Sequence, residues 1–227
     1  MTLSTVQDAL GLGAATADVA IAGLNTAIEV ASALKAKLVA ARAPGIDRVK
    51  IQSEITELQS SLQNTVDSAS FSGENWLSVD STGNTTKSVV ASLSRDASGN
   101  ITISTITVDV GPTGSMLVDS SGSGAGILDQ TRTVTSGGSY TVLNIDISAL
   151  TDSAADLTDL EDYIDGVDNA LSAMTVAGTV LGAAKSRIDT QKDFVTRLMD
   201  AIDTGIGQLV DANMNEESTK LQARLPQ

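Results

Sequence analysis

The chain has 227 residues, a formal net charge of −14 and neither cysteine nor histidine. The negative charge argues against nucleic acid and anionic membrane surfaces as partners, because both are bound through clustered Lys and Arg. A chain without thiols and imidazoles cannot form disulfides, and it lacks the usual catalytic nucleophiles and bases and the ligands of the common zinc sites. We therefore expect neither an enzyme nor a cofactor. Only 2% of the residues are aromatic, which favours thin, close-packed helical rods over a thick globular core.

The N-terminal part of the chain repeats its apolar residues in heptads. Leu10, Leu24 and Leu38 occupy one heptad position and Leu34 occupies the other, with alanines and glycines between them. This spacing predicts one long helix over residues 3–38, roughly 60 Å in length, whose small residues allow a partner helix to approach closely.

A second helix is expected after a short break. Pro44 and Gly45 end the first helix, and Asp47 is well placed to cap the next one. The apolar residues that follow share one face and predict a third rod for the same bundle: Ile51, Ile55, Leu58, Leu62 and Val66.

The stretch from residue 182 to 225 repeats the heptad pattern near the other end of the chain and predicts a helix with one apolar face and one polar face. Counting in sevens from Ile188 gives Val195, Ile202 and Leu209. We therefore expect the two ends of the chain to lie along one another. The predicted core seam of this rod consists of Leu10, Leu24, Leu34, Leu38, Ile188, Val195, Ile202 and Leu209.

The helical period breaks at a short segment that is rich in large side chains. Here Phe71, Trp76 and Leu77 surround Gly73, with Asn75 between them. We expect a turn anchor in which the three apolar side chains are buried at the end of the bundle while the chain reverses.

These motifs resemble the bacterial flagellins. Phe71–Leu77 is similar to the turn after the second helix of that family, in its alphaproteobacterial form. The likeness covers roughly residues 3–77 and 160–225 and includes four further stretches, which are Ala9–Ala15, Ile51–Ile55, Leu181–Asp189 and Asp211–Ser218. Flagellins carry additional terminal segments that form the inner tube of the filament, so the resemblance leads us to expect a trimmed fragment.

The middle of the chain, residues 80–150, is rich in Gly, Ser and Thr and alternates with a period of two. Residues 86–94 and 101–110 predict a β-hairpin with a turn at 96–100 and a bulge near Thr105. A second hairpin is expected between residues 130–135 and 140–147. The glycine-rich residues 120–126 between the two hairpins predict a loop.

Acidic residues crowd the region from 152 to 168, and no Lys or Arg occurs between residues 133 and 184. We interpret these acidic side chains as a solvent-exposed helix face whose first residues interact favourably with the helix dipole. A Ca²⁺ site is the alternative, but Asp162–Asp168 lacks the EF-hand spacing. No metal is therefore predicted, while a glycan or cation on the outer domain stays open.

The fold class that follows is α+β, an elongated coiled-coil-like helical rod with an inserted β-rich outer domain. We divide the chain into residues 1–79 (N-terminal half of the rod), 80–150 (outer domain) and 151–227 (C-terminal half of the rod). The resemblance implies an extracellular structural subunit of the bacterial flagellum that self-assembles as a homo-oligomer and reaches the cell surface through the flagellar export apparatus and its chaperone. The alternative is a flagellin-like surface protein whose outer domain binds polysaccharide or host surfaces, and an enzyme that uses paired carboxylates ranks third.

The family resemblance also identifies a segment that a vertebrate innate receptor, Toll-like receptor 5, recognises in many flagellins through Arg and Glu. The equivalent residues 32–39 of this chain include Leu34, Lys35, Lys37 and Leu38, with neither Arg nor Glu. A lysine cannot make the bidentate contacts of an arginine. We therefore expect weak or absent activation of the receptor.

Overall fold

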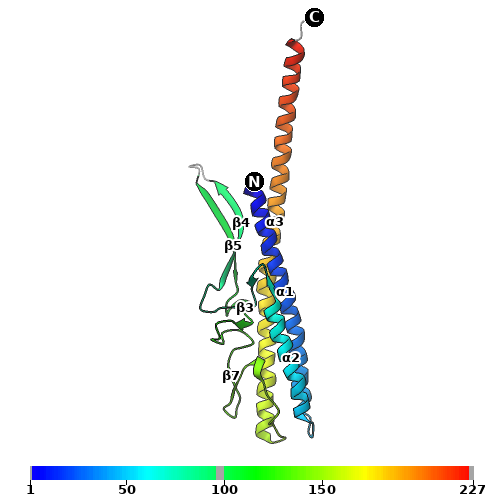
Figure 1. Cartoon of the computed structure of the whole chain (residues 1–227), viewed down its shortest axis with the longest axis vertical. Helices are drawn as coiled ribbons and strands as arrows, with labels where there is room; N and C mark the ends of the chain where they lie inside the picture. The colour runs from blue at the N-terminus through cyan, green and yellow to red at the C-terminus, as the bar shows by residue number, and fades with distance from the viewer. Residues whose placement is uncertain (1, 96–99, 225–227) are drawn as a thin grey trace.

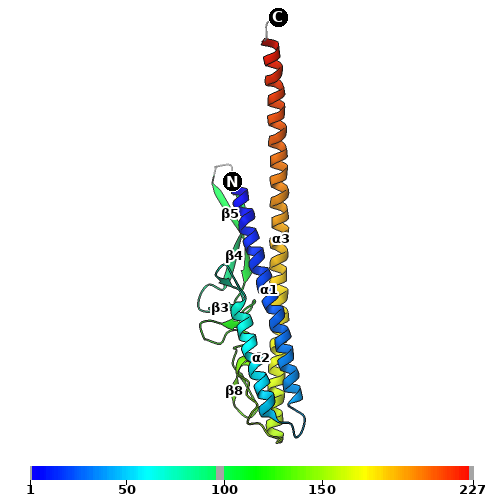
Figure 2. The same ribbon diagram turned by 45° about the vertical axis from the view of Figure 1, so that its right-hand side comes forward.

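The computed structural model describes residues 2–95 and 100–224, which form an elongated rod with a smaller segment packed along one side (Figure 1). Three helices make the rod: α1 (Thr2–Ala40), α2 (Arg48–Ser68) and α3 (Ala154–Arg224). Helix α1 runs antiparallel to both α2 and α3 (Figures 1 and 2). With 71 residues, α3 is about 105 Å long.

The heptad pattern of both chain ends is confirmed over most of its length. Leu10, Leu24, Leu34 and Leu38 of α1 are fully buried, and Ile188 and Val195 of α3 are buried with them. Each such side chain contributes about 1.5–3 kcal/mol when it leaves water. The shared seam is therefore the main stabilising feature of the rod.

Two members of the predicted seam were wrongly placed. Ile202 is 41% exposed and Leu209 is 72% exposed. Burial along α3 ends with Val195 and the half-buried Met199, so Ile202 and Leu209 lie beyond the contact with the described part of α1. The Gln7 side chain donates to the Thr196 hydroxyl at 3.1 Å near this end of the contact.

Helix α2 forms the predicted third rod. Gly45 supplies the turn before it with φ +74°, and the Asp47 carboxylate accepts a hydrogen bond from the Lys50 backbone N–H at 3.3 Å, which confirms the N-cap. Ile55 and Leu62 are buried. Because α2 has 21 residues and α1 has 39, α2 covers only part of α1.

Helix α1 is long and apolar enough to cross a membrane by composition, over Leu3–Ala40. Its leucines at positions 10, 24 and 38 are nevertheless fully buried in the core of the rod. The core helix of a water-exposed bundle has the same composition, so packing accounts for the apolar character of α1.

The segment between α2 and α3 contains short strands paired in twos. The antiparallel pairs are β1–β2, β4–β5 and β7–β8, and β3–β6 is parallel. A short 3₁₀ helix, η1, precedes α3. The bounds are β1 Ser70–Phe71, β2 Glu74–Asn75, β3 Ser78–Val79, β4 Thr86–Arg95, β5 Ile101–Asp109, β6 Val118–Asp119, β7 Arg132–Thr133, β8 Ser139–Tyr140 and η1 Val142–Asn144.

The first predicted hairpin is confirmed as β4 and β5, and residues 96–99 of its predicted turn lie outside the described residues. The bulge lies on the other strand from the one predicted. Val90 pairs with Thr105 and Ser92 pairs with Ser104, so Ala91 of β4 is the extra residue. Its carbonyl accepts a hydrogen bond from the Gln191 side chain of α3 at 3.0 Å, and the bulge thereby fastens the hairpin to the rod.

The second predicted hairpin was too long. Its ladder contains only two pairs, Arg132 with Tyr140 and Thr133 with Ser139. Residues 142–147 are not a strand, because α2 satisfies their backbone groups instead. The Gln59 side-chain amide donates to the carbonyls of both Val142 and Ile145, at 3.2 and 3.1 Å. The predicted loop at 120–126 is confirmed.

Candidate assembly surface

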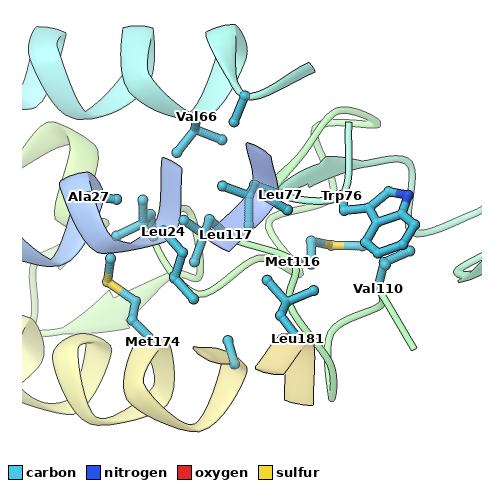
Figure 3. Close-up of a cluster of buried hydrophobic side chains, with 14 of the residues drawn as sticks. Leu24, Ala27, Val66, Trp76, Leu77, Val110, Met116, Leu117, Met174 and Leu181 are labelled. Atoms are coloured by element: carbon cyan, nitrogen blue, oxygen red, sulfur yellow. The ribbon is translucent and has the colours of Figure 1, made fainter. Parts of the chain in front are cut away.

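The rod and the outer segment (residues 80–150) share one continuous hydrophobic core. Figure 3 shows Leu24 of α1, Val66 of α2 and Leu181 of α3 meeting Met116 and Leu117 of the outer segment. All five side chains are fully buried. The outer segment is therefore held against the rod through apolar packing, which fixes the surface that the rod presents to its surroundings.

The predicted turn anchor is correct for two of its three large side chains. Trp76 and Leu77 are buried, but Phe71 is 37% exposed. Phe71 lies on β1, which pairs only with β2, and both residues of β1 are exposed. Gly73, with φ +82°, makes the tight turn that the sequence predicted.

Asn75 has a role that the sequence interpretation missed. Its side-chain amide donates to the Val66 carbonyl in the last turn of α2 at 2.8 Å. Its side-chain oxygen accepts from the backbone N–H groups of Leu77 and Ser78, at 2.8 and 3.0 Å. Asn75 therefore caps α2 and positions the buried part of the anchor at the same time.

Three helix glycines mark where the non-helical segments contact the rod. A side chain at Gly13 would overlap Val89 of β4, and one at Gly166 would overlap the Tyr140 hydroxyl. Gly23 is packed in the same way against the Ala69 side chain at the end of α2. Glycine in a helix interior costs about 1 kcal/mol relative to alanine, so close approach is the physical reason for these three.

Asp119 organises the outer segment. The residue is only 3% exposed, and its carboxylate accepts hydrogen bonds from the hydroxyls of Ser81, Ser121 and Ser123. The backbone N–H of Ser81 donates to it as well, at 3.1 Å. Burial alone would raise the pKa of Asp119, but these hydrogen bonds outweigh it and hold the pKa far below its usual range. The only sequence signal for this cluster was the serine-rich loop itself.

The acidic region at the start of α3 is used for structural contacts. Asp156 accepts from the Thr151 backbone N–H at 2.8 Å, and hydrogen bonds from Thr151 lower the pKa of Asp156. Asp162 accepts from the Thr135 backbone N–H at 2.6 Å and so holds the turn between β7 and β8. Within the described ranges, no group of three or more acidic side chains is arranged to hold a metal ion.

Arg48 closes the end of the rod where α1 turns into α2. Its buried guanidinium donates to the Ala41 carbonyl at 3.0 Å and to the Asp152 carboxylate at 2.7 Å. Asp152 also accepts from the Gly45 backbone N–H at 3.1 Å. The Arg48 hydrogen bond is the main cause that lowers the pKa of Asp152. This pair ties all three helices together at one point.

The segment equivalent to the receptor site lies on two sides of α1. Leu34 and Leu38 are buried in the seam, while Lys35 pairs with Asp168 of α3 and Lys37 pairs with Glu54 of α2, both at 2.5 Å. Both lysines therefore have partners within the chain. The expected weakness of receptor activation stays a prediction.

A large hollow on the described surface offers little for chemistry. It is an open groove of about 640 Å³ between α1 and α2, lined mainly by small and hydroxyl side chains, with Glu57 as its one charged residue. Catalysis by paired carboxylates needs two positioned acids in a cleft. A long rod built from both chain ends, with an outer segment packed along it, is the architecture of a structural protein that acts through its surfaces.

Comparisons with known proteins identify the family. Residues 1–82 match the bacterial flagellin N-terminal helical region, and residues 164–227 match the bacterial flagellin C-terminal helical region. Flagellin C of Rhizobium meliloti (strain 1021) is 44% identical over 97% of this chain and 73% of its own length. Flagellin A of the same strain is 37% identical over 97% and 78%, and a flagellin of Brucella melitensis biotype 1 is 35% identical over 97% and 69%.

The chain therefore belongs to the bacterial flagellins, of the alphaproteobacterial type, and the resemblance found in its sequence is confirmed. It is a structural subunit of the extracellular flagellar filament and serves motility. Self-assembly follows from the family. The sequence found six of the eight seam residues and two of the three large side chains of the anchor, but not the contacts of Asn75, Asp119 and Arg48.

Proposed function

We propose that the chain assembles by packing its rod surfaces side by side in a helical lattice through repeated heterologous contacts. The observation that carries this proposal is the single seam that α1 and α3 share, because it makes α1 and the part of α3 that packs against it one stiff body. Large apolar side chains remain on the outside of that body. Phe194 is 56% exposed and Val176 is 61% exposed, and such residues suit contacts between subunits.

We propose further that the division into residues 1–79, 80–150 and 151–227 reflects function, with the rod forming the lattice and the outer segment facing the medium. Export through the flagellar apparatus and its chaperone goes with this role. The carboxylates described above are used in folding contacts, which supports a chain without catalytic activity.

The alternative, an outer domain that binds polysaccharide or host surfaces, has less support. Sugar-binding platforms expose aromatic rings, whereas Tyr140, the one aromatic residue in the sequence of residues 80–150, is buried. The Tyr140 hydroxyl donates to the Asp162 carbonyl at 2.6 Å, and its ring meets Tyr163 edge-on at 4.7 Å between centroids. These rings therefore serve the packing of the outer segment.

The test of filament function uses the host bacterium. Deleting the gene should remove this subunit from sheared filaments, as detected by mass spectrometry, and should shorten the filaments or reduce swimming. The wild-type gene should restore both. Phe194→Asp and Val176→Asp should fold with a melting temperature close to wild type and yet weaken filaments, whereas Lys192→Asp, at an exposed polar position, should complement fully. Filaments that never contain the subunit would refute the function, and full complementation by both apolar variants would refute packing through this face.

Receptor recognition is tested separately. We expect the purified chain to activate a Toll-like receptor 5 reporter cell line weakly or not at all, since the equivalent segment offers only Lys35 and Lys37, each in an ion pair. An enteric flagellin is the positive control. Equal potency of the two proteins would contradict the prediction.

A further inference from the structure

We infer that two surfaces of the rod are complementary and meet between neighbouring copies of the chain. One is an exposed face of α3 around Phe194, and the other is the open groove between α1 and α2. The inference rests on the proposed side-by-side packing and names the two surfaces that make one such contact. Both belong to the packed part of the rod, since Val195, next to Phe194, is buried.

The face of α3 consists of exposed residues spaced by three or four positions, which places them on one side of the helix. They are Ala183, Arg187, Thr190, Phe194 and Arg197. The phenyl ring of Phe194 is a large apolar group in their middle. Helix α3 contains no acidic residue between 169 and 188, although the chain has a net charge of −14. The face is therefore apolar and basic on an acidic protein.

The two guanidinium groups of this face are unused within the chain. Seven other lysines and arginines of the described residues form ion pairs. Arg187 and Arg197 are exposed and have neither an ion pair nor a hydrogen bond with any residue that the structure describes. A guanidinium binds carboxylates well because of its planar fork of donors. Both groups are available for a carboxylate of another molecule.

The groove between α1 and α2 has the opposite character. It has a volume of about 640 Å³ and mainly small or hydroxyl-bearing walls, to which Gly23 and Ser61 belong. Its one charged lining residue is Glu57, which is exposed and unpaired among the described residues. Two more exposed acids, Glu29 and Asp67, lie within one turn of lining residues. The groove has room for an apolar side chain and is acidic where the face of α3 is basic.

The two surfaces lie at different levels along the rod, as the ion pairs between the helices show. Lys35 of α1 pairs with Asp168 of α3, and Lys37 pairs with Glu54 of α2, both at 2.5 Å. The carboxylate of the groove, one turn after Glu54, therefore lies at about the level of Asp168. Arg187 lies roughly 28 Å further along α3. The face of α3 thus cannot fill the groove of its own chain, whereas a second copy can place it there.

The surfaces also agree in direction and spacing. Helices α2 and α3 run in the same direction, because α1 is antiparallel to both (Figures 1 and 2). A copy that points the same way and is displaced by roughly 28 Å along the rod brings Arg187 to Glu57. Phe194 then reaches Asn64, which lines the groove seven residues after Glu57. The contact joins two different surfaces and can therefore repeat from copy to copy, and its charges fix the register.

The absence of cysteine allows a direct test by disulfide cross-linking in filaments of the host bacterium. Subunits that carry both Ser61→Cys and Thr190→Cys should give, after mild oxidation, a ladder of linked subunits on a non-reducing gel. Within one chain the two positions are roughly 27 Å apart along the rod, too far for a disulfide, so every link joins two copies. Single cysteine variants should give no ladder.

A second pair of cysteines is the matched control. Thr179 is also an exposed threonine of α3, but it lies roughly 16 Å from Thr190 along the helix. Subunits with Ser61→Cys and Thr179→Cys should therefore enter filaments without forming the ladder. Equal ladders from the two pairs would mean that the links form by random collision.

Charge reversal tests the same contact without cysteine. Arg187→Glu and Glu57→Arg are changes at exposed positions, so each variant should melt at the wild-type temperature. Each places like charges together between copies and should lower the temperature at which sheared filaments depolymerise. The two changes combined in one subunit should restore most of that loss. Glu57→Arg combined with Lys192→Glu, at an exposed residue on another side of α3, should not.

The outcomes separate this contact from assembly in general. Filaments that contain the cysteine pair at 61 and 190 but give no ladder would overturn the contact, and so would charge variants that do not compensate one another. Side-by-side packing would then use other surfaces, with the groove facing the medium. Filaments that never contain the wild-type subunit would instead refute the proposed function, and the contact with it.

Discussion

The rod and the outer segment are stabilised in different ways, although they share one core. The rod depends on apolar side chains at heptad spacing, of which Leu24 and Ile188 are fully buried examples. The described chain between α2 and α3 has three ladders of only two residue pairs, and the outer segment depends more on polar contacts, with Asp119 at their centre. Repetitive apolar contacts give length and stiffness, while individual hydrogen bonds give an irregular segment one conformation.

The largest expected effect is in the rod. Leu24→Asp places an unpaired carboxylate at a fully buried position, so we expect a loss of about 3–5 kcal/mol, enough to unfold the rod and the outer segment together. The matched control is Ile202→Asp, at a position that is 41% exposed, where the expected loss is within about 0.5 kcal/mol. Thermal melts followed by circular dichroism decide between them, and equal losses would contradict the seam as the structure places it.

The contact between rod and outer segment comes next. Gly166→Ala should displace Tyr140, whose hydroxyl donates to the Asp162 carbonyl at 2.6 Å. A net loss of about 1–2 kcal/mol is expected, since the lost contacts outweigh the gain in helix propensity. Gly182→Ala, with free space around it, should stabilise the chain by up to about 1 kcal/mol. Melts of the two variants should move in opposite directions; a shift in the same direction would mean that Tyr140 does not need the glycine.

A comparable effect, confined to the outer segment, is expected from Asp119→Asn. Loss of a buried acceptor costs about 1–3 kcal/mol at neutral pH. Because the folded-state pKa of Asp119 lies below its unfolded value, its contribution is complete above about pH 4 and declines as the pH falls further. Between about pH 4 and pH 2 the variant should therefore lose less stability than the wild type. Identical slopes in denaturant titrations at these pH values would argue against the role of this carboxylate.

The smallest effect concerns the turn between β1 and β2. Ser72 has φ +53°, in the left-handed region, and Gly73 follows with φ +82°. Asparagine tolerates this conformation better than serine, and Asn-Gly is the preferred pair for such turns. Ser72→Asn should raise the melting temperature by about 1–2 °C. Gly73→Ala, which puts a β-carbon into the same strained region, should lower it, and a rise there instead would show that the turn relaxes freely.

The same contrast explains what could be predicted from the sequence. The heptads fixed the helices and their buried face, since every member of the seam from Leu10 to Leu38 is buried as expected. They could not fix how far the contact between α1 and α3 extends, which is why Ile202 and Leu209 were expected in the core but are exposed. In the outer segment the alternation of apolar and polar residues predicted the hairpin of β4 and β5. The hydrogen bonds of Asn75 and Asp119 could not be predicted, because they join residues whose proximity depends on the complete fold.

Arg48 has a mechanical consequence. The start of α1 lies at the end of the bundle opposite the Arg48–Asp152 pair (Figure 2). A force that pulls α1 and α3 apart at that end therefore opens the seam between them progressively from there. The seam residues near the start of α1 carry the load first and one after another. The charged tie among the Ala41 carbonyl, Arg48 and Asp152 carries it last. When α1 and α3 are pulled apart at that end, the seam of the subunit should therefore open in small steps, and the end of the bundle at Arg48 should stay folded until the last step.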